Sequence, residues 1–326
     1  MRIYGVAFPA AVLFAAALPA SQAVCAQAYP SKPIRMIVTA AAGSGPDITA
    51  RIVGQKMAVA LGQQVVIDNR AGAGGTIGAE LAAKAPPDGY TTVMASAGSH
   101  AVSPALYRKL SWDPIRDFTA VSLVSVAPNI LVIHPSLPAK SVKELIALAK
   151  ARPGELSFGS GGNGSTAHLS GELFRSMAGL QLVHVPFKGA PSAALAIMSG
   201  QVELGLLNLP PTLPAVRTGK LRGLAVTSAK RFTAVAELPT IAEAGVPGYE
   251  ATTWYGIMLP AGAPPDITQR LNGVILAALR SEDTRQRIAA DGGEAVGSTP
   301  DEMIAIIRRD LAKWTKVVNE SGARVD

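Results

Sequence analysis

The feature that most constrains the fold of this chain is a regular alternation of strand-like and helix-like segments. Parallel strands need a crossover between them, usually a helix, so this alternation predicts parallel sheets covered by helices. Capping boxes at residues 141–144 and 299–302 mark helix starts, and Gly62 and Gly200 stand where helix C-caps belong. The strand-like runs are residues 34–40, 64–69, 91–96, 129–135, 155–160, 182–187, 202–208 and 221–228. The sequence therefore predicts an α/β protein.

Two further segments, residues 118–135 and 249–262, have the pattern of long extended crossings and not of strand–helix units. We expect the chain to leave a first domain, build a second one and return. This predicts a discontinuous domain I, residues 29–125 plus 252–326, around a domain II of residues 126–251. A cleft between two domains that are hinged by two strands is a common place for a small ligand.

The N-terminus has the pattern of a secretory signal peptide. Arg2 supplies a short positive region, residues 6–20 are apolar, and a small-residue cleavage site follows at residues 26–28. We predict a signal peptide over residues 1–28 with cleavage after Ala28, and a mature protein in the periplasm. No later segment is apolar and long enough to be expected to span a bilayer.

Cys25 is the only cysteine of the chain and lies upstream of this cleavage site. Lipidation of Cys25 is an alternative, but residues 22–24 match the small-residue box of lipoproteins poorly. The mature chain is therefore expected to have no disulfide, no thiolate nucleophile and no cysteine metal site.

The formal net charge is +7, and the basic residues are scattered along the chain and not gathered into one stripe with aromatic residues. This distribution argues against nucleic-acid binding. A mild positive field favours small anions as ligands.

A first glycine loop, residues 41–47, lies between a strand-like run and a helix-like run. It lacks the Gly-Lys-Ser/Thr of a phosphate-binding Walker loop, and Ile48 stands where the third glycine of a dinucleotide motif would be. The free N–H groups of the first helical turn make this loop an anion site. Asp47 is either an acid that compensates the helix dipole or an acceptor for a ligand group.

A second glycine loop lies within residues 157–174, where glycines 159, 161 and 164 satisfy the spacing GxGxxG. No acidic residue follows about 20 residues on to hold a ribose, so the rest of the dinucleotide fingerprint fails. We expect no nucleotide cofactor. What remains is a loop with small polar side chains, Ser160, Asn163, Ser165 and Thr166, at a helix N-terminus.

Two further loops, residues 69–80 and 96–104, also follow strand-like runs and combine Gly with Ser or Thr. In open α/β sheets, ligands bind at the carboxyl ends of the strands. Loops of this kind facing each other across a hinge would hold a small anion from two sides. The expected ligand is a carboxylate and not a nucleotide phosphate.

Catalytic and metal-binding patterns are weak. The chain has no GxSxG, no HExxH and no other close pair among its four histidines. His100 and His168 lie beside the expected ligand loops and are either structural residues or ligand contacts. A site built from His168 and Glu172 alone would lack ligands for a metal, so no metal is expected. Trp254 and Tyr255 belong either to the core or to a wall of the cleft.

An ordered set of motifs over the whole mature chain carries a resemblance to a known family. The motifs are YPSKPIRMIV (29–38), the glycine loop that ends at residues 47–51, NRAGAGGTIGAE (69–80), APPDGYT (85–91), HVPFKGA (184–190), GKLRGLAVTSAKR (219–231) and residues 238–256. Together they closely resemble the periplasmic solute-binding proteins of tripartite tricarboxylate transporters, the Bug family. The resemblance implies a type II periplasmic binding protein fold, with two α/β domains closing on a ligand. It also implies a carboxylate ligand held by backbone N–H groups, small hydroxyls and ordered waters.

The resemblance also implies which residues bind the ligand. Those of domain I would be Gly43, Ser44, Asp47, Gly98 and Ser99, and those of domain II would be Ser160, Asn163, Ser165, Thr166, His168 and Asn208.

The chain departs from the family pattern at several positions. Thr39 and Ala40 replace Pro-Phe, Leu207 precedes Asn208 where many members have an acid, and Phe187 stands where many have Tyr. The loss of an acid makes the cleft less suited to an amino acid. We therefore expect a mono- or dicarboxylate with an apolar or aromatic body.

The resulting prediction is a monomeric binding protein, not an enzyme, that captures an organic acid for the membrane subunits of a transporter. One alternative is a ligand-sensing partner of a membrane receptor kinase that uses the same cleft. A less favoured alternative is an exported enzyme with a Ser/His site, for which the sequence offers no oriented pair of nucleophile and base.

Overall fold

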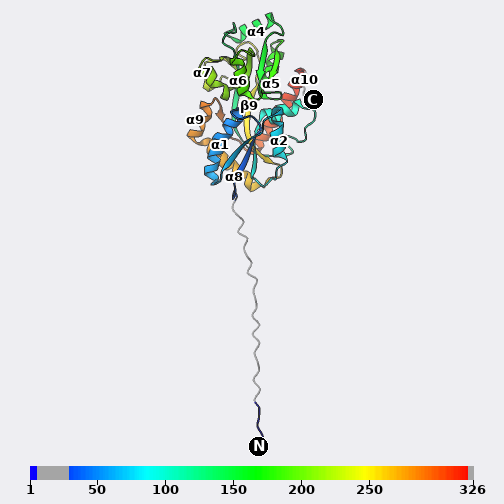
Figure 1. The fold of residues 1–326 in the computed structure, drawn as a ribbon, viewed down its shortest axis with the longest axis vertical. Helices are drawn as coiled ribbons and strands as arrows, with labels where there is room; N and C mark the ends of the chain where they lie inside the picture. The colour runs from blue at the N-terminus through cyan, green and yellow to red at the C-terminus, as the bar shows by residue number, and fades with distance from the viewer. Residues whose placement is uncertain (6–28, 322–326) are drawn as a thin grey trace.

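The computed structural model describes residues 1–5 and 29–321. Most of the predicted signal peptide, including the expected cleavage site, lies outside these residues. The alternation of strands and helices is confirmed, because each of the eight strand-like runs contributes a strand to the sheet. Figure 1 shows two lobes, with α4 to α7 in one and α1, α2 and α8 in the other.

The first lobe in chain order is built from both ends of the chain. Its elements are β1 (Ile34–Val38), α1 (Gly45–Leu61), β2 (Val65–Asn69), η1 (Ala73–Gly75), α2 (Thr76–Ala83), β3 (Thr91–Ser96), η2 (Gly98–Val102), α3 (Ser103–Leu106), the first part of β4 (Phe118–Ile133), β9 (Thr252–Pro260), α8 (Pro265–Arg280), α9 (Glu282–Ala290), β10 (Glu294–Ala295) and α10 (Pro300–Ser321). Strands β2, β1 and β3 are parallel, and β9 pairs antiparallel with β3 and with β4.

The second lobe holds the middle of the chain. Its elements are the last part of β4, then α4 (Val142–Ala151), β5 (Ser157–Ser160), α5 (Thr166–Met177), β6 (Val183–Pro186), α6 (Ala190–Met198), β7 (Leu204–Asn208), α7 (Leu209–Arg217), β8 (Arg222–Val226) and η3 (Thr233–Val235). Strand β5 is parallel to β6 and β7, and β4 pairs antiparallel with β7 and β8.

The two crossing segments join the lobes as the sequence predicts. Strand β4 pairs with β9 over its first part, up to Pro128 opposite Thr252, and with β7 from Asn129 onward. At the junction, the Asn129 N–H group donates to Thr227 Oγ1 at 2.8 Å, and the Ala251 N–H group donates to the Thr227 carbonyl at 2.8 Å. One continuous strand and one returning chain therefore lie side by side where the lobes meet.

The C-terminal helix α10 contributes to the cores of both lobes. Met303 and Ile307 pack with Trp112 and Phe118 in the first lobe. Trp314, Val317 and Val318 belong to a cluster that also holds core residues of the second lobe. In Figure 1 the end of α10 accordingly lies beside α5. Because one helix bridges the lobes, the exact domain boundaries, 29–125 plus 252–326 and 126–251, stay a prediction.

Candidate functional site

A cavity of about 550 Å³ lies between the two lobes. Residues from both lobes line it, and most are small or apolar. The lining residues are Thr39, Ala40, Ala41, Ser44, Pro46, Ala71, Gly72, Ala73, Gly74, Gly75, Ser96, Gly98, Tyr107, Gly161, Gly162, Asn163, Ser165, Thr166, Phe187, Lys188, Gly189, Ala190, Asn208, Thr253 and Tyr255. This volume suits a small organic molecule.

Five helices begin at this cavity. Their N-cap residues are Ser44 of α1, Gly75 of α2, Ser165 of α5, Gly189 of α6 and Asn208 of α7, and all five line it. Only in α5 does the N-cap side chain bond the first turn, where the His168 N–H group donates to Ser165 Oγ at 3.2 Å. The positive ends of five helix dipoles therefore converge on one space, which favours an anionic guest.

The side chains around the cavity add to this positive field. Among the described lining residues Lys188 is the one charged residue, and none is acidic. A ligand ammonium group would find no carboxylate partner there. Phe187, Pro46 and several alanines supply apolar wall between the polar groups.

Asp47 does not line the cavity but holds the first glycine loop from behind. Its carboxylate, 2% exposed, accepts from the Gly43 N–H group at 2.8 Å, from Arg51 Nε at 3.1 Å and from Asn69 Nδ2 at 3.0 Å. Burial alone would raise the pKa of Asp47, but these hydrogen bonds outweigh it and lower the pKa. The sequence left two interpretations of Asp47 open. The hydrogen bonds of its carboxylate support a structural role over contact with a ligand. Gly43 likewise takes part in the loop and does not line the cavity.

Ser99 lies fully buried behind the cavity, whereas its neighbour Gly98 lines it. The Ser99 hydroxyl lies 2.9 Å from His100 Nδ1 and accepts a hydrogen bond from the Ser96 N–H group at 3.1 Å. Burial lowers the pKa of His100 to about 3, and its ring packs against Trp112 and Phe118. Ser99 and His100 therefore support η2 as buried core residues.

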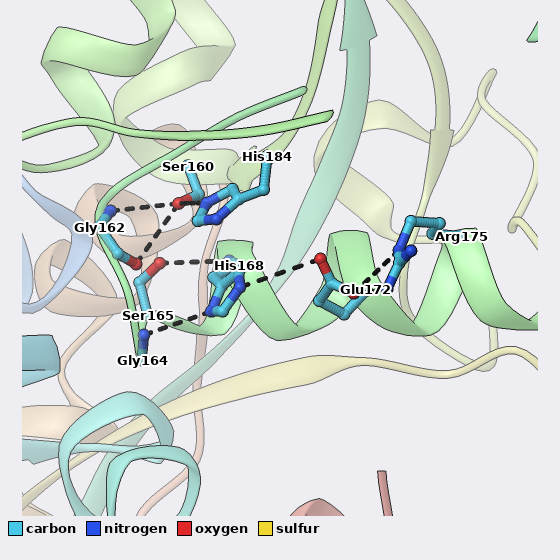
Figure 2. A network of polar contacts seen from close by, with 8 residues as sticks. All are labelled: Ser160, Gly162, Gly164, Ser165, His168, Glu172, Arg175 and His184. Carbon is cyan, nitrogen blue, oxygen red and sulfur yellow. Dashed lines mark hydrogen bonds and ion pairs between the residues drawn. The ribbon is translucent and has the colours of Figure 1, made fainter. Parts of the chain in front are cut away.

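A network of polar contacts supports the second glycine loop (Figure 2). The Ser160 hydroxyl lies 2.7 Å from His184 Nε2 and accepts a hydrogen bond from the Gly162 N–H group at 3.2 Å. The His168 ring stacks on the His184 ring, with centroids 4.1 Å apart. Neither Ser160 nor His168 lines the cavity, whereas Gly162 does. These side chains therefore position the loop that faces the cavity.

Both histidines of this network are neutral. Burial, His184 and Arg175 lower the pKa of His168 to about 3, and burial lowers that of His184 to about 4. The Gly164 N–H group donates to His168 Nδ1 at 3.4 Å, which leaves the ring proton on Nε2, facing Glu172 at 4.0 Å. Glu172 itself pairs with Arg175 at 2.6 Å.

The sequence offers no oriented pair of nucleophile and base, whereas the structure brings Ser160 and His184 into contact. The pair lacks the other parts of a catalytic site, however. Ser160 is 0% exposed and does not line the cavity, and no carboxylate among the described residues bonds the His184 ring. A substrate in the cavity would not reach this hydroxyl.

Asn208 is the predicted site residue on β7, and the structure ties it to the junction of the lobes. Its Nδ2 donates to Asn129 Oδ1 at 2.7 Å and to Thr166 Oγ1 at 3.3 Å. Asn129 Nδ2 donates in turn to Ser170 Oγ at 2.7 Å. This chain of amide and hydroxyl groups links the wall of the cavity to β4 and α5.

Of the predicted site residues, the structure brings Ser44, Gly98, Asn163, Ser165, Thr166 and Asn208 to the cavity. It buries Asp47, Ser99, Ser160 and His168 behind the cavity wall, and Gly43 is exposed and does not line the cavity. That the first group contacts a ligand stays a prediction. Sequence reasoning missed Lys188, Tyr107 and Thr253, and left Tyr255 open between core and wall. Tyr255 is both, since it is 1% exposed and lines the cavity.

The hydroxyls of Thr253 and Tyr255 are buried and make no hydrogen bond of good geometry within the part of the chain that the structure describes. Both project from β9 with one residue between them, so they lie on the same face of the strand. Buried hydroxyls ordinarily have a partner. Their position beside the cavity makes them available to a guest or to a water.

Among the described residues, two of the close contacts between the lobes lie beside the cavity. Ser103 Oγ donates to the Gly74 carbonyl at 3.0 Å and to the Gly164 carbonyl of the other lobe at 3.3 Å. A Cβ on Gly74 would lie 2.2 Å from Ser103 Oγ and 3.0 Å from Gly164 Cα, so this approach requires glycine. At the second place, a Cβ on Gly189 would lie 3.1 Å from Ala41 Cβ.

Two other kinds of site find no support in residues 1–5 and 29–321. No three His, Cys, Asp or Glu side chains in these ranges are grouped so that they could hold a metal ion. No helix in the same ranges is long and apolar enough to cross a membrane.

The fold and the cavity are those of a two-domain periplasmic binding protein. Solved structures with this fold include the R. palustris protein Rpa4515 with adipate, at TM-score 0.88 and 39% identity, covering 90% of this chain and 98% of that one. MatC from Rhodopseudomonas palustris with bound malate has TM-score 0.85 and 31% identity, covering 89% of this chain and 100% of that one. The fold predicted from the resemblance is thereby confirmed.

Sequence comparison identifies the family. The model described as the tripartite tricarboxylate transporter family receptor matches residues 49–323. Protein BugT of Bordetella pertussis is 38% identical over 314 residues, which cover 96% of each chain. The chain therefore belongs to the tripartite tricarboxylate transporter receptor family, the family of the Bug proteins, as the sequence motifs predict.

Proposed function

We propose that this protein captures a small organic carboxylate in the periplasm and delivers it to the membrane subunits of a tripartite tricarboxylate transporter. The observation that carries the proposal is the convergence of five helix N-termini and one lysine on a cavity without an acidic residue among its described lining. Such a site favours an anion, and its described lining offers no carboxylate to an ammonium group. The related proteins Rpa4515 and MatC have been solved with adipate and with malate, which are small dicarboxylates.

Backbone N–H groups at helix N-termini, with the hydroxyls of Ser165 and Thr166, would hold the carboxylate. The apolar wall that includes Phe187 and Pro46 would cover the carbon chain. Binding would stabilise contact between the lobes, because the residues on both sides of the cavity would then share one guest. The membrane subunits would recognise this closed form.

We infer that the protein is not an enzyme, since the serines of the Ser160–His184 and Ser99–His100 pairs are both fully buried and neither lines the cavity. The sensor alternative uses the same binding step and differs only in the membrane partner. Deletion of the gene for this binding protein distinguishes the two: loss of carboxylate uptake is expected for transport, and loss of a transcriptional response with uptake intact would indicate sensing.

The first experiment is a thermal-shift screen on protein expressed as the full chain and purified from the periplasm. A ligand at 100 times its dissociation constant adds about 2.7 kcal/mol of stability. We expect shifts with dicarboxylates and none with diamines or NAD. A shift with NAD alone would overturn the proposal. The mass of the same preparation tests the predicted cleavage after Ala28 and the absence of a lipid.

A further inference from the structure

We propose that Lys188 forms an ion pair with one carboxylate of the ligand and thereby selects dicarboxylates over singly charged analogues. The inference rests on the proposed function and names the ligand class of that same cavity. Lys188 lies in the short connection between β6 and α6 and lines the cavity.

The backbone on both sides of Lys188 is fixed. The Phe187 N–H group donates to the Ser160 carbonyl at 3.0 Å, and the Gly189 N–H group donates to the Gly161 carbonyl at 3.2 Å. The Lys188 carbonyl accepts from Ser192 Oγ at 3.3 Å. Lys188 is thus held against the second glycine loop while its long side chain is exposed.

The ammonium group of Lys188 has no counter-ion in the part of the chain that the structure describes. Other lysines of the chain, such as Lys56 and Lys84, pair with carboxylates, but Lys188 forms no ion pair within the described residues. The cavity beside it offers no acid either. A cation that borders an anion-binding cavity and lacks a partner is placed to meet a ligand charge, and charge-assisted hydrogen bonds are stronger than neutral ones.

The distribution of charge argues for two carboxylates in the ligand. The helix N-termini offer neutral N–H donors and partial charges, which suffice for one carboxylate. Lys188, whose neighbour Gly189 meets Ala41 of the other lobe, adds one full positive charge to the lining of the cavity. A linear dicarboxylate can use both, with its methylene chain along the apolar wall, whereas a half-amide of the same length gives up one of the two charged contacts.

The test is isothermal calorimetry with succinate, glutarate and adipate and with the half-amide of each. The protein variants are wild type, Lys188→Gln, Lys188→Arg and the control Lys230→Gln. Lys230 is exposed in the same lobe and does not line the cavity, so its substitution changes the net charge equally. The quantity compared is the ratio of the half-amide Kd to the dicarboxylate Kd, because this ratio isolates the contact to the second carboxylate.

We expect Lys188→Gln to lower this ratio about tenfold, a change typical of one charge-assisted contact at a partly exposed site. Lys188→Arg should keep most of the ratio, and Lys230→Gln should keep all of it. If dicarboxylates bind wild type and the ratio is the same in Lys188→Gln, this inference is wrong while the proposed function stands. If none of the compounds binds wild type, the ligand is not a linear dicarboxylate and this inference is wrong, whereas the proposed function is decided by the thermal-shift screen.

Discussion

At the scale of single residues, Asp47 shows how a buried acid can serve an anion site without touching the anion. Its carboxylate accepts hydrogen bonds from Gly43, Arg51 and Asn69. These bonds fix the loop that begins α1. The first-turn N–H groups of α1 then remain directed outward from a loop of defined shape.

Replacing Asp47 by Asn removes the charge and one acceptor, and places an amide donor against the loop. We expect the free energy of unfolding to fall by about 1–3 kcal/mol at neutral pH. The pKa of Asp47 is lower in the fold than its ordinary value of 3.8, so this contribution is present above that value and is lost as pH falls through the lower folded pKa. Urea unfolding of wild type and Asp47→Asn at pH 7 and pH 3 should show that the difference in their free energies of unfolding is smaller at pH 3.

The control is Asp266→Asn, which replaces an exposed acid in the first turn of α8. Equal stability of wild type and Asp47→Asn at pH 7 would contradict the assigned role.

At the scale of elements, α5 and β6 meet through the stacked rings of His168 and His184. Both rings are neutral in the fold, with pKa values lowered from 6.5 to about 3 and about 4. The unfolded chain takes up protons first as pH falls below 6.5, so the stability held by the neutral rings declines from there toward pH 4.

Substitution of His184 by Phe keeps an aromatic ring in the stack and removes one titrating group. The free energy of unfolding of His184→Phe should therefore depend less steeply on pH between 6.5 and 4 than that of wild type. Ser160→Ala is the matched control, because it removes the same hydrogen bond and leaves both histidines in place. Parallel pH profiles for wild type and His184→Phe would show that the ring does not titrate as assigned.

Elements could be predicted from the sequence more fully than the site could. Strand and helix runs are set by local patterns, as the capping box at Ser141 illustrates, where the Glu144 N–H group donates to the serine at 3.2 Å. The placement of a side chain depends on partners far along the chain. Asp47 has a partner 22 residues away in Asn69, and Lys188 borders the cavity because its loop packs on residues 160–161. No local pattern could separate Gly98, at the cavity, from Ser99, behind it.

At the scale of the whole molecule, the lobes are joined by more than the two crossing segments. Helix α10 and the α3 region share a hydrophobic cluster with the second lobe, through Trp314, Val102 and Leu106 among others. Ser103 lies next to this shared cluster and bonds carbonyls of both lobes. Contact between the lobes and the shape of the cavity are therefore linked through this region.

Ser103→Ala should weaken binding of a dicarboxylate about two- to tenfold, which corresponds to the loss of one hydrogen bond of ordinary strength. The control is Ser122→Ala, because the Ser122 hydroxyl is also buried but donates to Leu123 and Ser298 within one lobe. Calorimetry should show weaker binding for Ser103→Ala alone. Equal effects of the two substitutions would mean that Ser103 acts through general stability and not through contact between the lobes.

The central claim is that an organic anion binds in the cavity at the helix N-termini, and one steric variant tests it most directly. A Cβ on Gly98 would have only ordinary contacts, 3.7 Å from the Thr166 N–H nitrogen, so Gly98→Val places methyl groups at the start of α5 without a forced clash at the Cβ. The control is Gly273→Val in α8, where a Cβ would meet nothing within 4 Å. Calorimetry with the best dicarboxylate of the screen should show binding to wild type and Gly273→Val, and a loss of at least about a hundredfold in Gly98→Val, about 2.7 kcal/mol. Unchanged affinity in a folded Gly98→Val protein would place the ligand elsewhere and contradict the account.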